Sequence, residues 1–141
     1  MYATIADLNK RITQDELIRL TDEADSGQVI TATIEAALEA AGVEIDSYLA
    51  VDDRYELPLA DPQPLLSTLA VDIAIWNLYS LDDSGVPENR KDRYREALKT
   101  LERLSTGKQT LGGEEKAAAG SSAAVFTAPD RLFSRTTLKD I

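Results

Sequence analysis

The stretch PQPLLSTLAVDIAIWNLYSL, residues 62–81, is apolar on nearly every side when it is wound as a helix. Asp61 followed by Pro62 has the pattern of an N-cap and a first helical residue, which predicts a helix over about residues 62–81. A helix that is apolar all round is buried at the centre of a bundle or covered by another subunit. This stretch therefore predicts the central helix of an all-α protein.

One carboxylate interrupts this helix. Asp72 lies between Val71 and Ile73, and a charged group that is buried among apolar side chains needs a partner. Arg54, in the proline-rich loop before the helix, is the partner that we predict, so that Arg54 and Asp72 form a candidate structural pair. An alternative is equally open, in which Asp72 lies at an exposed edge of the helix.

Further helices are predicted on both sides of the central one. Apolar residues recur every three or four positions over residues 28–50, which predicts a long amphipathic helix. Pro87 is predicted at the first position of a highly charged helix that ends near Gly107. Two pairs of capping residues predict two short helices near the start of the chain: Thr4 with Asp7, and Thr13 with Glu16. Residues 1–105 show no convincing strand alternation, and we predict that they form a small helical bundle of about four to five helices.

The amino-acid composition changes after residue 105. Residues 106–124 are rich in glycine and alanine, and Leu111 is their one large apolar residue, which predicts a flexible linker. Residues 125–141 contain both phenylalanines and an excess of basic over acidic residues, which predicts an extended C-terminal arm that contacts a partner. The alternative is that this arm packs back on its own helices. The predicted partner-binding residues are Val125, Phe126, Arg131, Leu132, Phe133, Arg135 and Leu138.

The composition excludes most enzyme mechanisms. The chain of 141 residues has no cysteine and no histidine, which removes disulfides, thiolate nucleophiles, Cys/His zinc sites and imidazole catalysis. The pairs Asp52–Asp53 and Asp82–Asp83 could bind Mg²⁺, but turns favour aspartate for its hydrogen bonds to the backbone. We therefore expect no catalytic residues, no cofactor and no metal site. The sequence also has no signal-peptide pattern and no long apolar run, which predicts a soluble protein without membrane contact.

The charge is acidic overall and unevenly distributed. The net charge of −10 disfavours the wrapping of DNA on a basic surface. Residues 1–89 carry a net charge of −14, whereas residues 90–141 carry +4. Solvated helix faces explain this pattern, and so does an association in which the acidic side of one subunit meets the basic side of the next.

The order of several short motifs resembles a known family. The motifs are Met1-Tyr2-Ala3-Thr4, Glu44-Ile45-Asp46-Ser47-Tyr48-Leu49, Arg54-Tyr55-Glu56-Leu57-Pro58-Leu59 and Arg131-Leu132-Phe133-Ser134-Arg135. In this order they resemble the small neck proteins of Mu-like phages and prophages, which are related to the head–tail adaptors, or connectors, of tailed phages.

This resemblance implies a structural virion protein rather than an enzyme. It implies a homo-oligomeric ring of twelve copies that lies beneath the portal at the head–tail junction and continues the DNA channel to the tail. The implied partners are the portal protein, a tail-side neck protein (a stopper or a tail terminator) and double-stranded DNA that passes without specific binding. Assembly is expected in the cytoplasm of the bacterial host. The alternative is a small acidic protein that mimics DNA and inhibits a nucleic-acid enzyme.

Overall fold

Five α-helices and one short 3₁₀ helix make up the part of the chain that the computed structural model describes, residues 1–61 and 63–112. No residue of these two ranges lies in a strand, which confirms the predicted all-α fold. In chain order, the elements are α1 (Ile5–Asn9), α2 (Gln14–Thr21), α3 (Thr31–Leu49), η1 (Val51–Asp53), α4 (Pro64–Ser80) and α5 (Glu88–Ser105).

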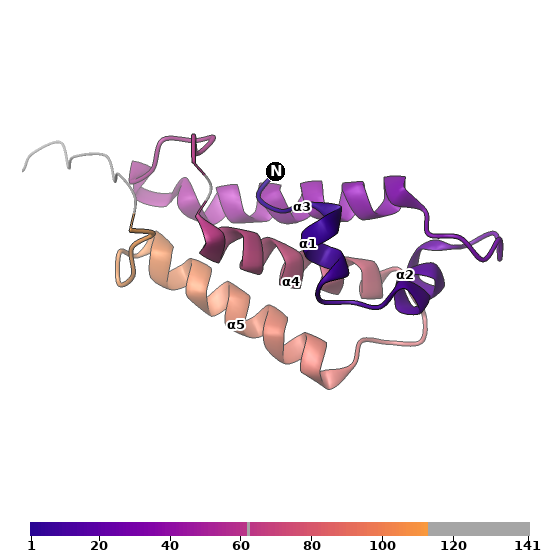
Figure 1. Cartoon of the computed structure of the whole chain (residues 1–141). Helices are drawn as coiled ribbons and strands as arrows, with labels where there is room; N and C mark the ends of the chain where they lie inside the picture. The colour runs from indigo at the N-terminus through magenta and orange to yellow at the C-terminus, as the bar shows by residue number, and fades with distance from the viewer. Residues whose placement is uncertain (62, 113–141) are drawn as a thin grey trace, which may run out of the picture.

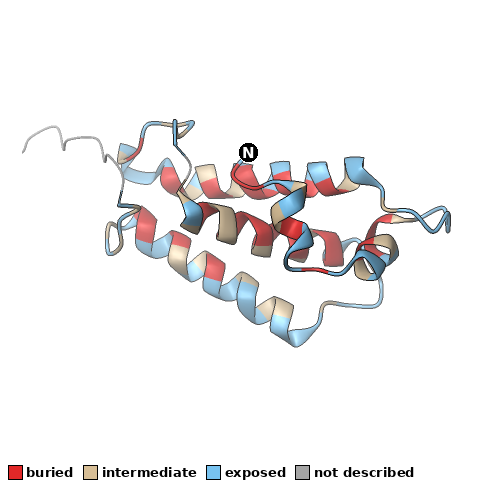
Figure 2. Ribbon diagram, viewed as in Figure 1, coloured by how far each residue is buried: buried red, intermediate tan, exposed pale blue. Residues whose placement is uncertain are grey.

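The helix α4 lies at the centre of the bundle. It packs along α3 and α5 and also contacts α1 and α2, and Figure 1 shows it running between the two long helices. Buried residues occur along the whole helix, as the red segments of α4 in Figure 2 show. They are Leu66, Leu69, Ala70, Val71, Ile73, Ala74, Ile75, Leu78 and Tyr79. The prediction of a central helix is therefore confirmed.

The two short N-terminal helices begin where the capping residues predicted. Thr4 caps α1, and its hydroxyl oxygen accepts a hydrogen bond from the backbone N–H of Asp7, whose carboxylate in turn accepts from the N–H of Thr4. Thr13 caps α2 by accepting from the N–H of Glu16 at 3.3 Å. Each cap satisfies a backbone donor that the first turn of a helix leaves free.

Three predicted helix starts are shifted. The helix predicted over residues 28–50 begins at Thr31, because Ile30 is still extended and serves as its N-cap. The central helix begins at Pro64 rather than Pro62, because Gln63 is extended, as sterics require of a residue that precedes proline. Pro87 is the N-cap of α5 and not its first residue.

The C-terminal end of α5 is packed against the loop that precedes α4. Gly107 follows the C-cap Thr106 with a positive φ of 70°, as predicted for the residue that ends this helix. The guanidinium of Arg54 occupies the space in which a side chain at residue 107 would begin. Leu111 is half-buried against the core, so the first residues of the predicted linker lie against the bundle. The rest of the linker and the arm at 125–141 lie outside the described residues, and their boundaries stay predictions.

Candidate functional site

The described residues present polar contacts between helices, charged outer faces and two pockets. Within residues 1–61 and 63–112, no group of three or more acidic side chains lies close enough together to hold a metal ion. None of the helices in these ranges has the length and the apolar composition needed to cross a membrane. Asp52 and Asp53 lie in the short 3₁₀ helix η1 and have positive φ angles. The Asp82 carboxylate accepts from the N–H of Ser84, as the turn interpretation of the second pair predicted.

The carboxylate of Asp72 is held by two arginines from different parts of the chain. Its Oδ1 lies 3.6 Å from a guanidinium nitrogen of Arg11, in the connection between α1 and α2, and 3.6 Å from one of Arg93 on α5. Asp72 is only 11% exposed, and this oxygen is buried without a hydrogen bond. The two cations therefore compensate a charge that would otherwise be costly to bury on α4.

The predicted pairing of Asp72 with Arg54 is corrected by these contacts. The Arg54 side chain lies over Gly107, near the start of α4, whereas Asp72 lies two turns into this helix. The partners Arg11 and Arg93 are 61 and 21 residues away from Asp72 in sequence. No local pattern marks them, because tertiary packing alone brings them to α4. The exposed-edge alternative is also wrong, since Asp72 is mostly buried.

A second polar cluster fixes α2 against α4 and α5. The hydroxyl of Tyr79, on α4, donates a hydrogen bond to Glu16 at the start of α2. Arg90, on α5, lies 3.9 Å from the same carboxylate and donates to the backbone carbonyl of Arg11 at 3.0 Å. Burial raises the pKa of Glu16, but the hydrogen bond from Tyr79 and the charge of Arg90 outweigh burial and lower this pKa overall. Glu16 therefore remains ionised and binds both neighbouring helices.

Aromatic side chains connect α3, α4 and α5 on another side of the bundle. The rings of Trp76 and Tyr94 stack with centroids 4.6 Å apart and planes 4° from parallel. The Tyr94 hydroxyl donates to Glu44 on α3 at 3.0 Å. Burial, followed by this hydrogen bond and the charge of Glu44, raises the pKa of Tyr94 to about 12. Because the neutral phenol is the donor, this contact depends on Tyr94 keeping its proton.

The outer faces of the long helices differ in charge. On α3, Glu35 and Glu39 are exposed, and Val43 is 65% exposed. On α5, ion pairs of 2.8–3.5 Å join charges three or more residues apart: Lys91 with Glu88, Arg95 with Glu88 and Asp92, and Lys99 with Glu96. These pairs support the interpretation of α5 as a salt-bridged, solvated face.

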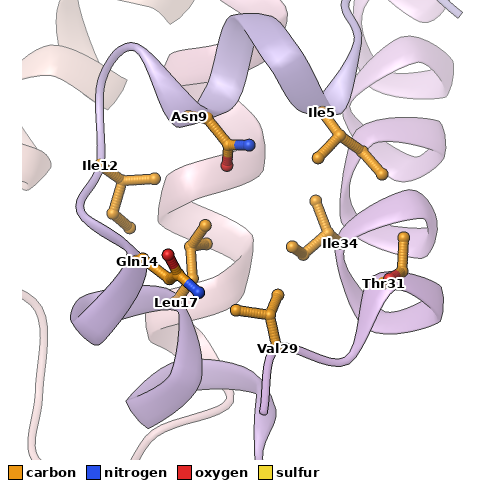
Figure 3. Close-up of a pocket in the computed structure, with 8 residues that line it drawn as sticks. All are labelled: Ile5, Asn9, Ile12, Gln14, Leu17, Val29, Thr31 and Ile34. Atoms are coloured by element: carbon orange, nitrogen blue, oxygen red, sulfur yellow. The ribbon is translucent and has the colours of Figure 1, made fainter.

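Two pockets lie at opposite ends of the bundle. The first, which we call the N-terminal pocket, has a volume of about 470 Å³ and lies between α1, α2 and the start of α3 (Figure 3). It is lined by Ile5, Asn9, Ile12, Gln14, Leu17, Val29, Thr31 and Ile34. The second, which we call the acidic pocket, has a volume of about 410 Å³. It is lined by Tyr55, Glu56, Leu59, Ala60, Asp61, Gln63 and Leu111. Sequence patterns predicted neither pocket, because both form between elements that local periodicity does not place in space.

Comparison with known proteins identifies the class to which this helical bundle belongs. The sequence model of the family described as "Bacteriophage Mu, Gp36" matches residues 2–128. The chain belongs to this family of Mu-like phage proteins, which confirms the resemblance seen in the sequence.

Two relatives illustrate the match. The chain is 36% identical to "Gene product J" of Escherichia phage Mu over 119 residues, which are 84% of this chain and 81% of the relative. It is 26% identical to "Mu-like prophage FluMu protein gp36" of Haemophilus influenzae over 141 residues, covering 99% of this chain and 96% of the relative.

The predicted partner-binding residues of the arm stay untested. Val125 and Phe126 fall inside the range that the family model matches, and the remaining five arm residues lie beyond residue 128. All seven lie outside the described part of the chain.

Double-mutant cycles test which arginine balances Asp72. For Asp72→Asn combined with Arg93→Gln, we expect a coupling free energy of about 0.5–1 kcal/mol, because the two side chains are in contact. For Asp72→Asn combined with Arg54→Gln, the losses should add to within about 0.3 kcal/mol. Urea unfolding at low salt measures each free energy of unfolding. Equal coupling in the two cycles would contradict this assignment.

The contact of Tyr94 with Glu44 predicts a pH dependence on the alkaline side. Tyr94→Phe keeps the stacking on Trp76 but removes the hydrogen bond, and it should cost about 1 kcal/mol of stability at pH 8. Since the folded-state pKa of Tyr94 is raised, its contribution is complete below the unfolded pKa of about 10 and is lost as the pH rises towards 12. The difference in unfolding free energy between wild type and variant should therefore shrink above pH 10. A difference that is constant from pH 8 to pH 11 would refute this role of the phenol.

Proposed function

We propose that the protein is a structural head–tail adaptor of a Mu-like tailed phage. Twelve copies form a ring beneath the portal and continue the DNA channel towards the tail. The observation that carries this proposal is the family match over residues 2–128, together with motifs that resemble phage neck proteins along nearly the whole chain. In this role the protein acts in the virion, as a structural component and not as a catalyst, after assembly in the host cytoplasm.

The charge of the described surface supports a role beside passing DNA. The outer face of α3 carries Glu35 and Glu39 without an ion-pair partner in the described residues. An acidic wall repels phosphates, so that DNA slides past it without specific binding. The exposed side chains of Val43 and Val51 are apolar groups that a neighbouring subunit would remove from water.

The arm at residues 125–141 supplies the contact between components in this proposal. Its apolar and basic residues follow a spacer rich in small residues, which gives the arm the reach to a neighbouring protein. The portal protein and a tail-side neck protein, either a stopper or a tail terminator, are its proposed partners.

Imaging of the neck tests this function directly. Purified portal rings mixed with the full-length chain should show, by cryo-electron microscopy, an added ring of twelve copies on the tail-side face of the portal. A variant with Phe126→Ser, Leu132→Ser and Phe133→Ser should bind at a much lower occupancy, while Val43→Ala on the bundle serves as a matched loss of an apolar side chain. Portal particles without the added ring, or virions whose neck lacks this protein, would overturn the proposal.

A further inference from the structure

The acidic pocket combines an apolar floor with a negatively charged rim. Tyr55 is buried, and Leu59 and Leu111 are half-buried along the floor. Glu56 and Asp61 are exposed at the rim. A pocket of this kind complements apolar side chains that are flanked by positive charges.

The backbone around the pocket adds to this negative potential. The helix α3 ends just before the loop that forms the pocket, and its last turn contains no basic residue, so the partial negative charge of its C-terminus is not compensated there. Asp52 follows closely and is exposed. The cation in this loop, Arg54, lies over Gly107 and does not line the pocket.

The chain itself contains a segment with the complementary pattern. Residues 131–135 read Arg-Leu-Phe-Ser-Arg, with two large apolar residues between two arginines. We propose that the acidic pocket of the free subunit binds residues 131–135 of the same chain. Leu132 and Phe133 contact the floor, and Arg131 and Arg135 pair with Glu56 and Asp61.

The position of Leu111 explains why the same chain is the occupant. Leu111 lines the pocket, so the remaining chain starts at the edge of the pocket. The 18 residues from 113 to 130 separate this edge from the binding segment, and a spacer of that length rich in small residues has a root-mean-square span of about 23 Å. Tethering at this distance gives an effective concentration in the millimolar range. A second copy at micromolar concentration therefore competes weakly.

This docking concerns the free subunit and does not depend on the proposed function. Its consequence is that the arm's apolar side chains are covered until a partner displaces them. A failure of ring formation on the portal would leave this inference standing, and a failure of docking would leave the adaptor role standing.

The absence of native cysteine allows a direct test by disulfide cross-linking in the full-length chain. Ala60→Cys, at the pocket, combined with Ser134→Cys, in the arm, should form an intramolecular disulfide under mild oxidation. Intact mass and non-reducing gels should show that the cross-linked product is a monomer. The rate of cross-linking should not change when the protein is diluted. Thr31→Cys, at the N-terminal pocket, combined with Ser134→Cys is the distant control and should cross-link more slowly.

Ala60 could cross-link faster than Thr31 merely because it lies nearer to the start of the arm. Charge reversal separates this effect from binding at the pocket. In the Ala60→Cys/Ser134→Cys background, Glu56→Lys with Asp61→Lys should slow cross-linking at least about fivefold, as expected for two exposed charge pairs. Arg131→Glu with Arg135→Glu should slow it similarly, and the four reversals together should restore the rate. Rates that are indifferent to these reversals, or cross-links that form only between chains, would overturn the inference. Unchanged circular dichroism melting confirms that the variants are folded.

Discussion

The helix α4 has apolar side chains on every side, and the fold must exclude water from all of them at once. Nine of its residues are buried, and burial of each large one contributes about 1.5–3 kcal/mol relative to exposure. Two long helices, α3 and α5, flank α4, while α1 and α2 contact it as well. The short helices α1 and α2 are therefore part of the cover of the core. Without them, part of α4 would face water.

Burial alone does not fix how these helices are oriented, because the hydrophobic effect has no direction. The polar contacts provide that direction. Arg11 and Arg93 meet at Asp72, and Tyr79 and Arg90 meet at Glu16, so that the connection between α1 and α2 is held against both α4 and α5. These charged groups pair with one another within the bundle, whereas the glutamates on α3 and the rim of the acidic pocket are exposed to partners.

The sequence predicted what depends on local patterns. Threonine caps predicted the starts of α1 and α2 correctly. Apolar patterns and proline positions predicted α3, α4 and α5 with starts displaced by one to three residues. Long-range contacts were not predictable in the same way. The position of Arg54 in the loop before α4 favours it as the partner of Asp72, but packing brings Arg11 and Arg93 there instead. The pockets likewise depend on how separate elements meet, and the proposed binding residues of the arm lie beyond the described residues.

Native-state hydrogen exchange tests most directly the claim that α4 is the core on which the other helices depend. If the claim holds, the amides of residues 68–79 exchange only through global unfolding, with a free energy equal to that from urea unfolding. The amides of α1 and α2 should exchange at a lower free energy, because each is short and covers α4 from one side. Faster exchange in α4 than in α3 and α5 would contradict the account.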